Sequence, residues 1–250
     1  MIYIATGVTP NYLKRAYPFI KSMEDHGSRN SALPALFAVD FVDSVGCLPE
    51  IHTIPVTYSE AALQLPKFML QNGGFADFAP DTWRDEDVII FCDADAVLQR
   101  PFNYHELDTF REVRRSQVLA GRNKPEDGQT LADEATCLTP LVGPDTLRAR
   151  FPQHETMLCK NFGFVVARLD TWRELLEISK KLWPLIAESF SNPAMVQWMM
   201  CYATQSAGLE LVDLPLSIHA HGHLGLPQGL ACDNGIWKYH GDVVAYAHAL

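Results

Sequence analysis

The sequence lacks several features that would assign it to a protein class at once. Its 6 cysteines include no Cys-x-x-Cys pair, so neither a zinc ribbon nor a disulfide framework is indicated. No window approaches the roughly 18 consecutive apolar residues of a membrane span, and the chain opens without a basic, apolar leader. Basic residues number only 20 against 30 acidic ones, and the net charge of -10 argues against nucleic acid as a partner. We expect a cytoplasmic protein with free thiols and no integral membrane segment.

What the sequence does have is enough apolar material for one substantial core. The chain is 250 residues long and 48% apolar, which are ordinary values for a globular protein. No repeat and no linker of Pro, Gly or Ser divides it. We therefore expect a single domain over residues 1–250.

Hydrophobic periodicity predicts alternating strands and helices. We expect strands over residues 2–6, 33–42, 51–58, 88–92 and 162–169, and helices over 11–26, 60–71, 171–190 and 193–206. A glycine turn at Gly7 should end the first strand. Residues 121–140 are rich in Gly, Asn, Asp and Pro, which predicts a long loop without core. The alternation predicts an α/β fold with a mostly parallel central sheet flanked by helices.

One motif carries the chemistry, the sequence VIIFCDAD over residues 88–95. Its first five residues form a strand that is apolar on both faces, as in a buried parallel sheet. Asp93 and Asp95 follow at the carboxyl end, where α/β sheets bind ligands, and two residues apart they point to the same side. Two carboxylates there suit Mg²⁺ or Mn²⁺, with substrate phosphates filling other coordination positions.

Two enzyme families use such a pair of aspartates. In HAD-like phosphohydrolases the first aspartate, here Asp93, is a covalent nucleophile. That motif normally stands near the start of its domain, whereas residues 1–92 precede it here. The phosphohydrolase is therefore the alternative, and the other family fits more of the chain.

Six segments, in order, resemble the GT-A-fold glycosyltransferases of the glycogenin and bacterial galactosyltransferase kind. They are IYIATG over 2–7 with Asn11 close behind, PKFML over 66–70, DADAVLQRPF over 93–102, NFGFVV over 161–166, MVQ over 195–197 and YHG over 239–241. The segment after the D-x-D motif is similar to that family's pattern of two apolar residues, two others, Pro and an apolar residue.

The resemblance implies a Rossmann-like GT-A domain, with a nucleotide-binding half over 1–120 and an acceptor-side half over 121–250. It implies a hexosyltransferase-like, divalent-metal-dependent enzyme that transfers a sugar, with retention, from a nucleotide-sugar such as a UDP-sugar. Mn²⁺ or Mg²⁺ would be the metal, held by Asp93, Asp95 and His240. The donor would be held by Ala5, Thr6, Gly7, Asn11, Asp40, Lys67, Asp93 and Ala94. Asn161 and Gln197 would flank the sugar as catalytic residues, Gln197 stabilising the developing oxocarbenium charge.

Two departures from the family pattern keep a third alternative open. Phe162 stands where the family has Ser, and Val196 stands where it has Asp. A protein that binds a nucleotide-sugar without turning it over is compatible with both.

Histidines near the end of the chain leave the metal ligand open. His219, His221 and His223 alternate and would share one face of a strand, which also permits zinc. One of them is an alternative to His240 as the third ligand. The acceptor is open as well: a glycan, a lipid, a protein, a small molecule or a modified nucleic acid. Stereochemistry and oligomeric state are likewise left open.

Overall fold

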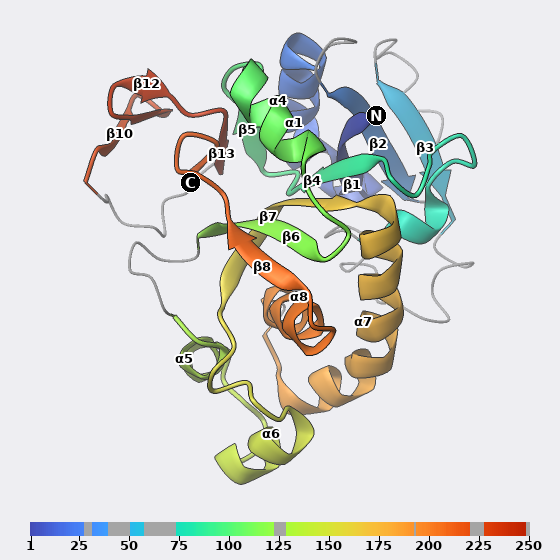
Figure 1. The fold of residues 1–250 in the computed structure, drawn as a ribbon, viewed down its shortest axis with the longest axis vertical. Helices are drawn as coiled ribbons and strands as arrows, with labels where there is room; N and C mark the ends of the chain where they lie inside the picture. Colours follow the sequence, from blue (N-terminus) through green and yellow to red (C-terminus); the bar gives the residue numbers. More distant parts are fainter. Residues whose placement is uncertain are drawn as a thin grey trace.

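A seven-stranded sheet forms the centre of the molecule (Figure 1). The computed structural model describes residues 1–27, 32–39, 51–57, 74–122, 129–192, 194–220 and 228–248. The sheet has the order β3-β2-β1-β4-β7-β6-β8. Its strands are β1 (Ile2–Val8), β2 (Leu33–Val39), β3 (His52–Val56), β4 (Val88–Cys92), β6 (Gln117–Arg122), β7 (Lys160–Arg168) and β8 (Glu210–Asp213). Only β7 runs against its neighbours, so the prediction of a mostly parallel sheet is confirmed.

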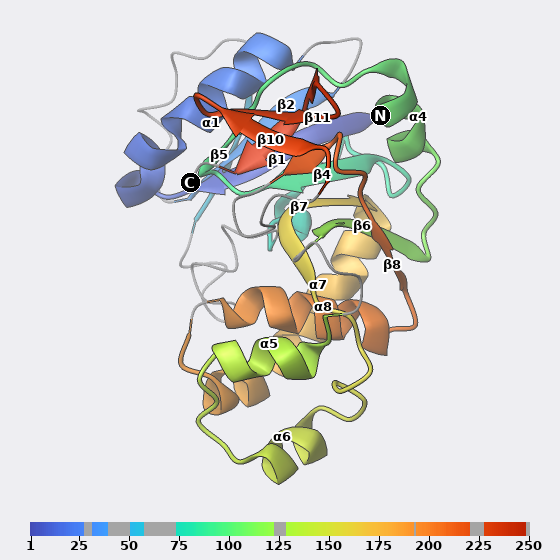
Figure 2. The same cartoon turned by 90° about the vertical axis from the view of Figure 1, so that its left-hand side faces the viewer.

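Helices cover both faces of this sheet (Figures 1 and 2). On one side lie α1 (Leu13–His26) and α4 (Tyr104–Arg111), and on the other α7 (Leu169–Ser189) and α8 (Met195–Ser206). Each side has its own hydrophobic cluster, because the central strands are apolar on both faces. Two short helices, α5 (Leu131–Cys137) and α6 (Pro144–Arg150), extend the α8 side away from the sheet. The chain is a mixed α/β single domain, as predicted.

The C-terminal part of the chain returns to the segment that follows the carboxyl end of β4. There β13 (Tyr246–His248) pairs with β5 (Ala96–Leu98) and with β9 (His219–Ala220). A second small sheet consists of β10 (Leu230–Asp233), β11 (Ile236–Tyr239) and β12 (Asp242–Val243). Two short 3-10 helices, η1 (Pro10–Tyr12) and η2 (Ala76–Phe78), complete the described elements. Residues that follow the D-x-D motif are thereby held by the end of the described chain.

Two expectations about elements differ from the structure, and a third is not tested by it. Gly7 does not end the first strand, because it pairs with Phe37 and β1 continues to Val8. Residues 131–137 form a helix whose Leu131 and Ala135 are buried in the core, so the loop predicted over 121–140 was wrong there. Thr130 and Asp133, which made this segment resemble a loop, form the capping box of α5. The helix predicted over 60–71 lies outside the described residues.

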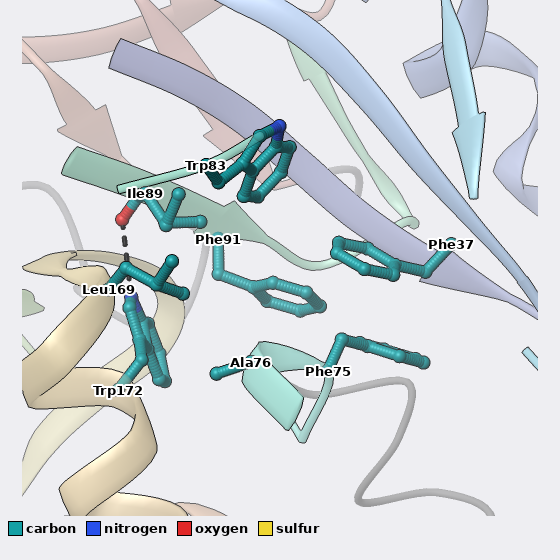
Figure 3. A pocket seen from close by; sticks show the side chains of 8 residues that line it. All are labelled: Phe37, Phe75, Ala76, Trp83, Ile89, Phe91, Leu169 and Trp172. Carbon is teal, nitrogen blue, oxygen red and sulfur yellow. Dashed lines mark hydrogen bonds between the residues drawn. The ribbon is translucent and has the colours of Figure 1, made fainter. Parts of the chain in front are cut away.

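A small apolar cavity lies in the core, between β4 and the start of α7 (Figure 3). Its volume is about 10 Å³, and it is lined by Phe37, Phe75, Ala76, Trp83, Ile89, Phe91, Leu169 and Trp172. Two of these side chains carry a polar atom, the indole nitrogens of Trp83 and Trp172, and Nε1 of Trp172 donates a hydrogen bond to the carbonyl of Ile89 at 3.3 Å. Among the described residues no polar atom contributes to the cavity wall, so the cavity is a packing feature of the core.

Two further expectations concern thiols and membranes. Cys92, Cys137, Cys159, Cys201 and Cys232 are free thiols, as predicted for them. Over the ranges that the structure describes, no helix has both the length and the apolar character needed to cross a membrane.

Candidate functional site

The first aspartate of the D-x-D motif is fixed at the carboxyl edge of the sheet. Asp93 follows β4, and its backbone N–H donates to the carbonyl of Gly163 on β7 at 2.8 Å. The hydroxyl of Tyr246 donates to the same carbonyl at 2.7 Å. Burial raises the pKa of Tyr246 well above its usual value, so this hydroxyl keeps its proton and remains a donor. The motif is therefore held between β7 and β13.

A cavity opens next to Asp93. It has a volume of about 50 Å³ and is lined by Asp93, Phe162, Gly163, Val196, Gln197 and Met200. Oε1 of Gln197 accepts from the backbone N–H of Phe162 at 3.3 Å, which ties α8 to β7. Oδ1 of Asn161 accepts from the N–H of Gly163 at 2.8 Å. The structure thus brings Asp93 and Gln197 to one cavity. Asn161 is the residue of β7 that precedes the lining residue Phe162.

Both departures from the family pattern fall on this cavity. Phe162 and Val196 are two of its lining residues, where the resemblance leads one to expect a hydroxyl and a carboxylate. The wall of this cavity is accordingly more apolar than the pattern implies.

The second aspartate of the motif is bound by a cation of the chain itself. Oδ2 of Asp95 accepts from Nη2 of Arg15 at 2.9 Å and from the hydroxyl of Tyr12 at 3.0 Å. The Arg15 guanidinium also lies 5.4 Å from the centre of the Tyr12 ring. Burial and the nearby Asp95 carboxylate raise the pKa of Tyr12 to about 12, so at neutral pH its hydroxyl is a donor.

These carboxylates fit a hard divalent cation in part. Oxygen ligands from one or two carboxylates, completed by phosphates and water, are usual for Mg²⁺ in nucleotide sites. The guanidinium on Asp95 shows that the position already holds positive charge. Within the described part of the chain, however, no three His, Cys, Asp or Glu side chains are grouped so as to hold a metal ion. The structure therefore does not bring His240 to Asp93 and Asp95.

His240 and His219 occupy different surroundings. His240 is exposed in the turn between β11 and β12, with its ring against Tyr239 at 4.4 Å. His219 is 2% exposed on β9, and its ring centre lies 5.3 Å from that of Tyr246. His221 and His223 lie outside the described residues. His219 is a core side chain in this structure.

The residues predicted to hold the nucleotide differ in how far they are exposed to a ligand. Ala5 and Thr6 are fully buried in β1, and the Thr6 hydroxyl donates to the carbonyl of Cys92 at 2.8 Å. Gly7 is buried within the strand, and Ala94 is 6% exposed. Among the members of this set that the structure describes, only Asn11 in η1 presents an exposed side chain. Asp40 and Lys67 lie outside the described residues.

Sequence reasoning missed a charged cluster farther along the same edge. Nζ of Lys160 at the start of β7 lies 2.5 Å from Oδ1 of Asp213 at the end of β8. Nε of Arg122 at the end of β6 lies 3.7 Å from the other carboxylate oxygen. A bulge between Ala120 and Gly121 shifts the register of β6 just before it. No sequence signal links these three residues, because their strands are far apart in the chain.

Tyr12 and Arg15 were missed for a different reason. They are three residues apart at the start of a predicted helix, a spacing that puts two side chains on one face. That signal was available beside Asn11. Pairing them with Asp95 needed the positions of β1 and β4 in the sheet.

We expect Lys160→Met to lower the free energy of unfolding by about 1–3 kcal/mol, because the buried Lys160 ammonium is the nearest cation to the partly exposed Asp213 carboxylate. The Lys160 side chain is only 9% exposed. Urea unfolding of the variant, of Asp213→Asn and of the double variant gives the coupling energy. A coupling energy of zero would contradict a stabilising pair.

Comparisons with known proteins complete the description of the site. No family model matches the chain, and no curated protein does. Solved structures do match. The galactosyltransferase LgtC, solved with donor and acceptor sugar analogues, aligns at a TM-score of 0.60 and 10% identity, over 99% of this chain and 86% of LgtC. Mouse xyloside xylosyltransferase 1 aligns at 0.59 and 11% identity, over 99% and 97%. The bifunctional glycosyltransferase WbbM aligns at 0.56 and 13%, over 88% of this chain and 40% of WbbM.

The chain has a GT-A glycosyltransferase fold. At these identities the likeness establishes the fold alone, and the predicted fold class is confirmed. In such α/β folds ligands bind beyond the carboxyl edge of the sheet. Four of the predicted site residues lie at that edge: Asp93, Asp95, Asn161 and Gln197.

Proposed function

We propose that the protein transfers a sugar from a nucleotide-sugar, a UDP-sugar by preference, to an acceptor that is still to be identified. The observation that carries the proposal is the cavity shared by Asp93 and Gln197 at the carboxyl edge of a GT-A sheet. The three solved structures compared above are glycosyltransferases. They give the HAD alternative no support.

Asp93 and Asp95 would hold Mn²⁺ or Mg²⁺, which neutralises the charge that develops on a leaving diphosphate. The backbone hydrogen bond from Asp93 to Gly163 holds the main chain that carries this carboxylate. His240 as a third ligand stays a prediction.

Gln197 would lie beside the anomeric carbon. Its amide oxygen carries partial negative charge and, being a poor nucleophile, would stabilise developing positive charge on the sugar. Because Oε1 already accepts from the Phe162 N–H, the side chain is oriented before substrate binds. LgtC also has an active-site glutamine, known from a solved glutamine-to-glutamate variant. Asn161, fixed by its bond to Gly163, would contact the sugar from β7. Transfer with retention is part of this proposal.

The donor and acceptor would occupy the two halves of the domain. Residues 1–120 supply β1, β2 and the D-x-D motif for the nucleotide, with Asn11 as the predicted contact that is exposed. Residues 121–250 supply Asn161, Gln197 and the Lys160–Asp213–Arg122 cluster on the acceptor side.

A second candidate, donor binding without turnover, is favoured by one observation. Phe162 and Val196 present apolar groups to the cavity where the family pattern has polar ones. Such a protein would bind the nucleotide-sugar and release it unchanged.

Calorimetry with UDP, GDP and their common sugars, with and without Mn²⁺, tests the proposal. We expect metal-dependent micromolar binding of one nucleotide series, lost in Asp95→Ala. Asp145→Ala is the matched control, because Asp145 is an exposed carboxylate on α6, away from the sheet.

Each outcome decides between the candidates. Binding followed by release of free UDP from the donor supports a transferase, whereas binding with an intact donor supports the non-catalytic protein. No binding of any nucleotide, with or without metal, would overturn both.

A further inference from the structure

The ion pair between Arg15 and Asp95 involves a basic residue at the N-terminal end of α1, where acidic residues are usual. Arg15 is in the first turn of α1, where the aligned peptide dipoles already make the helix end positive. A basic side chain there is unfavourable unless an anion offsets it. Asp95, 80 residues away in sequence, supplies that anion at 2.9 Å.

The surroundings hold the guanidinium in this position. Tyr12 contributes its hydroxyl to the same carboxylate oxygen and its ring to the guanidinium. Asp95 is 23% exposed and Arg15 66% exposed, so the pair lies at the mouth of the site, with water on one side. An exchange of one cation for another on Asp95 therefore needs no rearrangement of the core.

We propose that Arg15 and a divalent cation compete for the Asp95 carboxylate, and that the guanidinium, once displaced, binds a phosphate oxygen of the donor diphosphate. This inference deepens the proposed function and rests on it for the identity of the anion. Arg15 bound to Asp95 neutralises one of the two carboxylates of the motif while the site holds no metal. A divalent cation that takes Asp95 repels the guanidinium, and the incoming diphosphate attracts it.

Charge and geometry both favour a phosphate as the second partner. Guanidinium groups form paired hydrogen bonds to phosphate oxygens, and the N-terminal end of a helix attracts the same anion. Arg15 sits on the first turn of α1, directly after the β1 segment that the resemblance assigns to nucleotide binding. A short swing of an exposed side chain moves its charge from Asp95 to a ligand over that segment.

Competition predicts effects of opposite sign in one variant. In Arg15→Gln we expect Mn²⁺ alone to bind about fivefold more tightly, because no ion pair has to be broken. We expect UDP, at saturating Mn²⁺, to bind about tenfold more weakly, because one charge-assisted hydrogen bond to phosphate is lost. Electron paramagnetic resonance of free Mn²⁺ measures the first quantity, and calorimetry with UDP measures the second.

Lys14→Gln is the matched control, since Lys14 is the exposed basic neighbour of Arg15 on α1. It should change neither affinity. Tyr12→Phe keeps the ion pair and removes one hydrogen bond, so it should tighten Mn²⁺ binding less than Arg15→Gln does.

The two arms separate the inference from the proposed function. If wild type and Arg15→Gln bind Mn²⁺ equally, or neither binds it, Arg15 does not compete for Asp95 and the inference fails whatever UDP does. If Mn²⁺ binding tightens as expected but UDP binds neither protein, the competition stands, and the donor-phosphate role of Arg15 fails together with the proposed function.

Discussion

Replacing Trp198 by Ala should lower the free energy of unfolding by about 3–5 kcal/mol. Trp198 is fully buried on α8, and its ring centre lies 5.0 Å from Phe151, 5.2 Å from Phe190 and 5.5 Å from Tyr202. Its Nε1–H donates to the carbonyl of Leu131 at 2.7 Å. The variant therefore leaves both a large cavity and a buried carbonyl without its donor. Urea unfolding followed by circular dichroism measures the loss.

Two variants check the cause of that loss. Leu185→Ala removes a large side chain from α7 that is already 37% exposed, so it should cost far less than Trp198→Ala. Trp198→Phe keeps most of the apolar contact and loses the hydrogen bond, so it should lie between Leu185→Ala and Trp198→Ala. A loss below about 1 kcal/mol in Trp198→Ala would show that this aromatic cluster does not hold α5 and α6 to α8.

Asp93→Asn should reduce turnover of the donor by about 10²–10³-fold, under the proposed function, with little change in stability. The substitution preserves shape and the backbone hydrogen bond to Gly163, and it removes a negative charge from the cavity that Asp93 and Gln197 both line. Release of UDP from a UDP-sugar, to water or to an added sugar, measures the change. Unfolding in urea shows whether the fold is unaffected.

Asp108→Asn provides the comparison, because Asp108 is a half-exposed carboxylate on α4 that forms an ion pair with Arg111 on the same helix. It should turn over the donor at the rate of the wild type. Full turnover by Asp93→Asn would remove Asp93 from the reacting site, even if the protein binds a nucleotide.

The sequence predicts best what depends on neighbouring residues. The apolar run of β4 and the aspartates after it were readable directly, because burial on both faces and the end of a strand are local properties. The extents of α7 and α8 follow from helical periodicity in the same way.

Contacts between distant segments were not readable. The polar residues of the α5 capping box predict a loop when only the local composition is considered. That Leu131 packs in the core next to Trp198 of α8 is a contact between distant segments, which local composition does not indicate. Arg15 gave no sign of its partner, because only the pairing of β1 with β4 puts Asp95 within reach. The same holds for Lys160 and Asp213, whose strands are separated by β6.

The contact of Tyr246 with the D-x-D turn has a consequence for the order of folding. Its hydroxyl reaches the carbonyl of Gly163 across 83 residues and the carbonyl of Asp93 across 153. Contacts between such distant residues form slowly, because a long loop must close first. During synthesis β1 and β4 are complete well before residue 246 has been added. Tyr246 can fix the D-x-D turn only after the chain has been synthesised through that residue, so we expect a ligand-competent site to be a late product of folding.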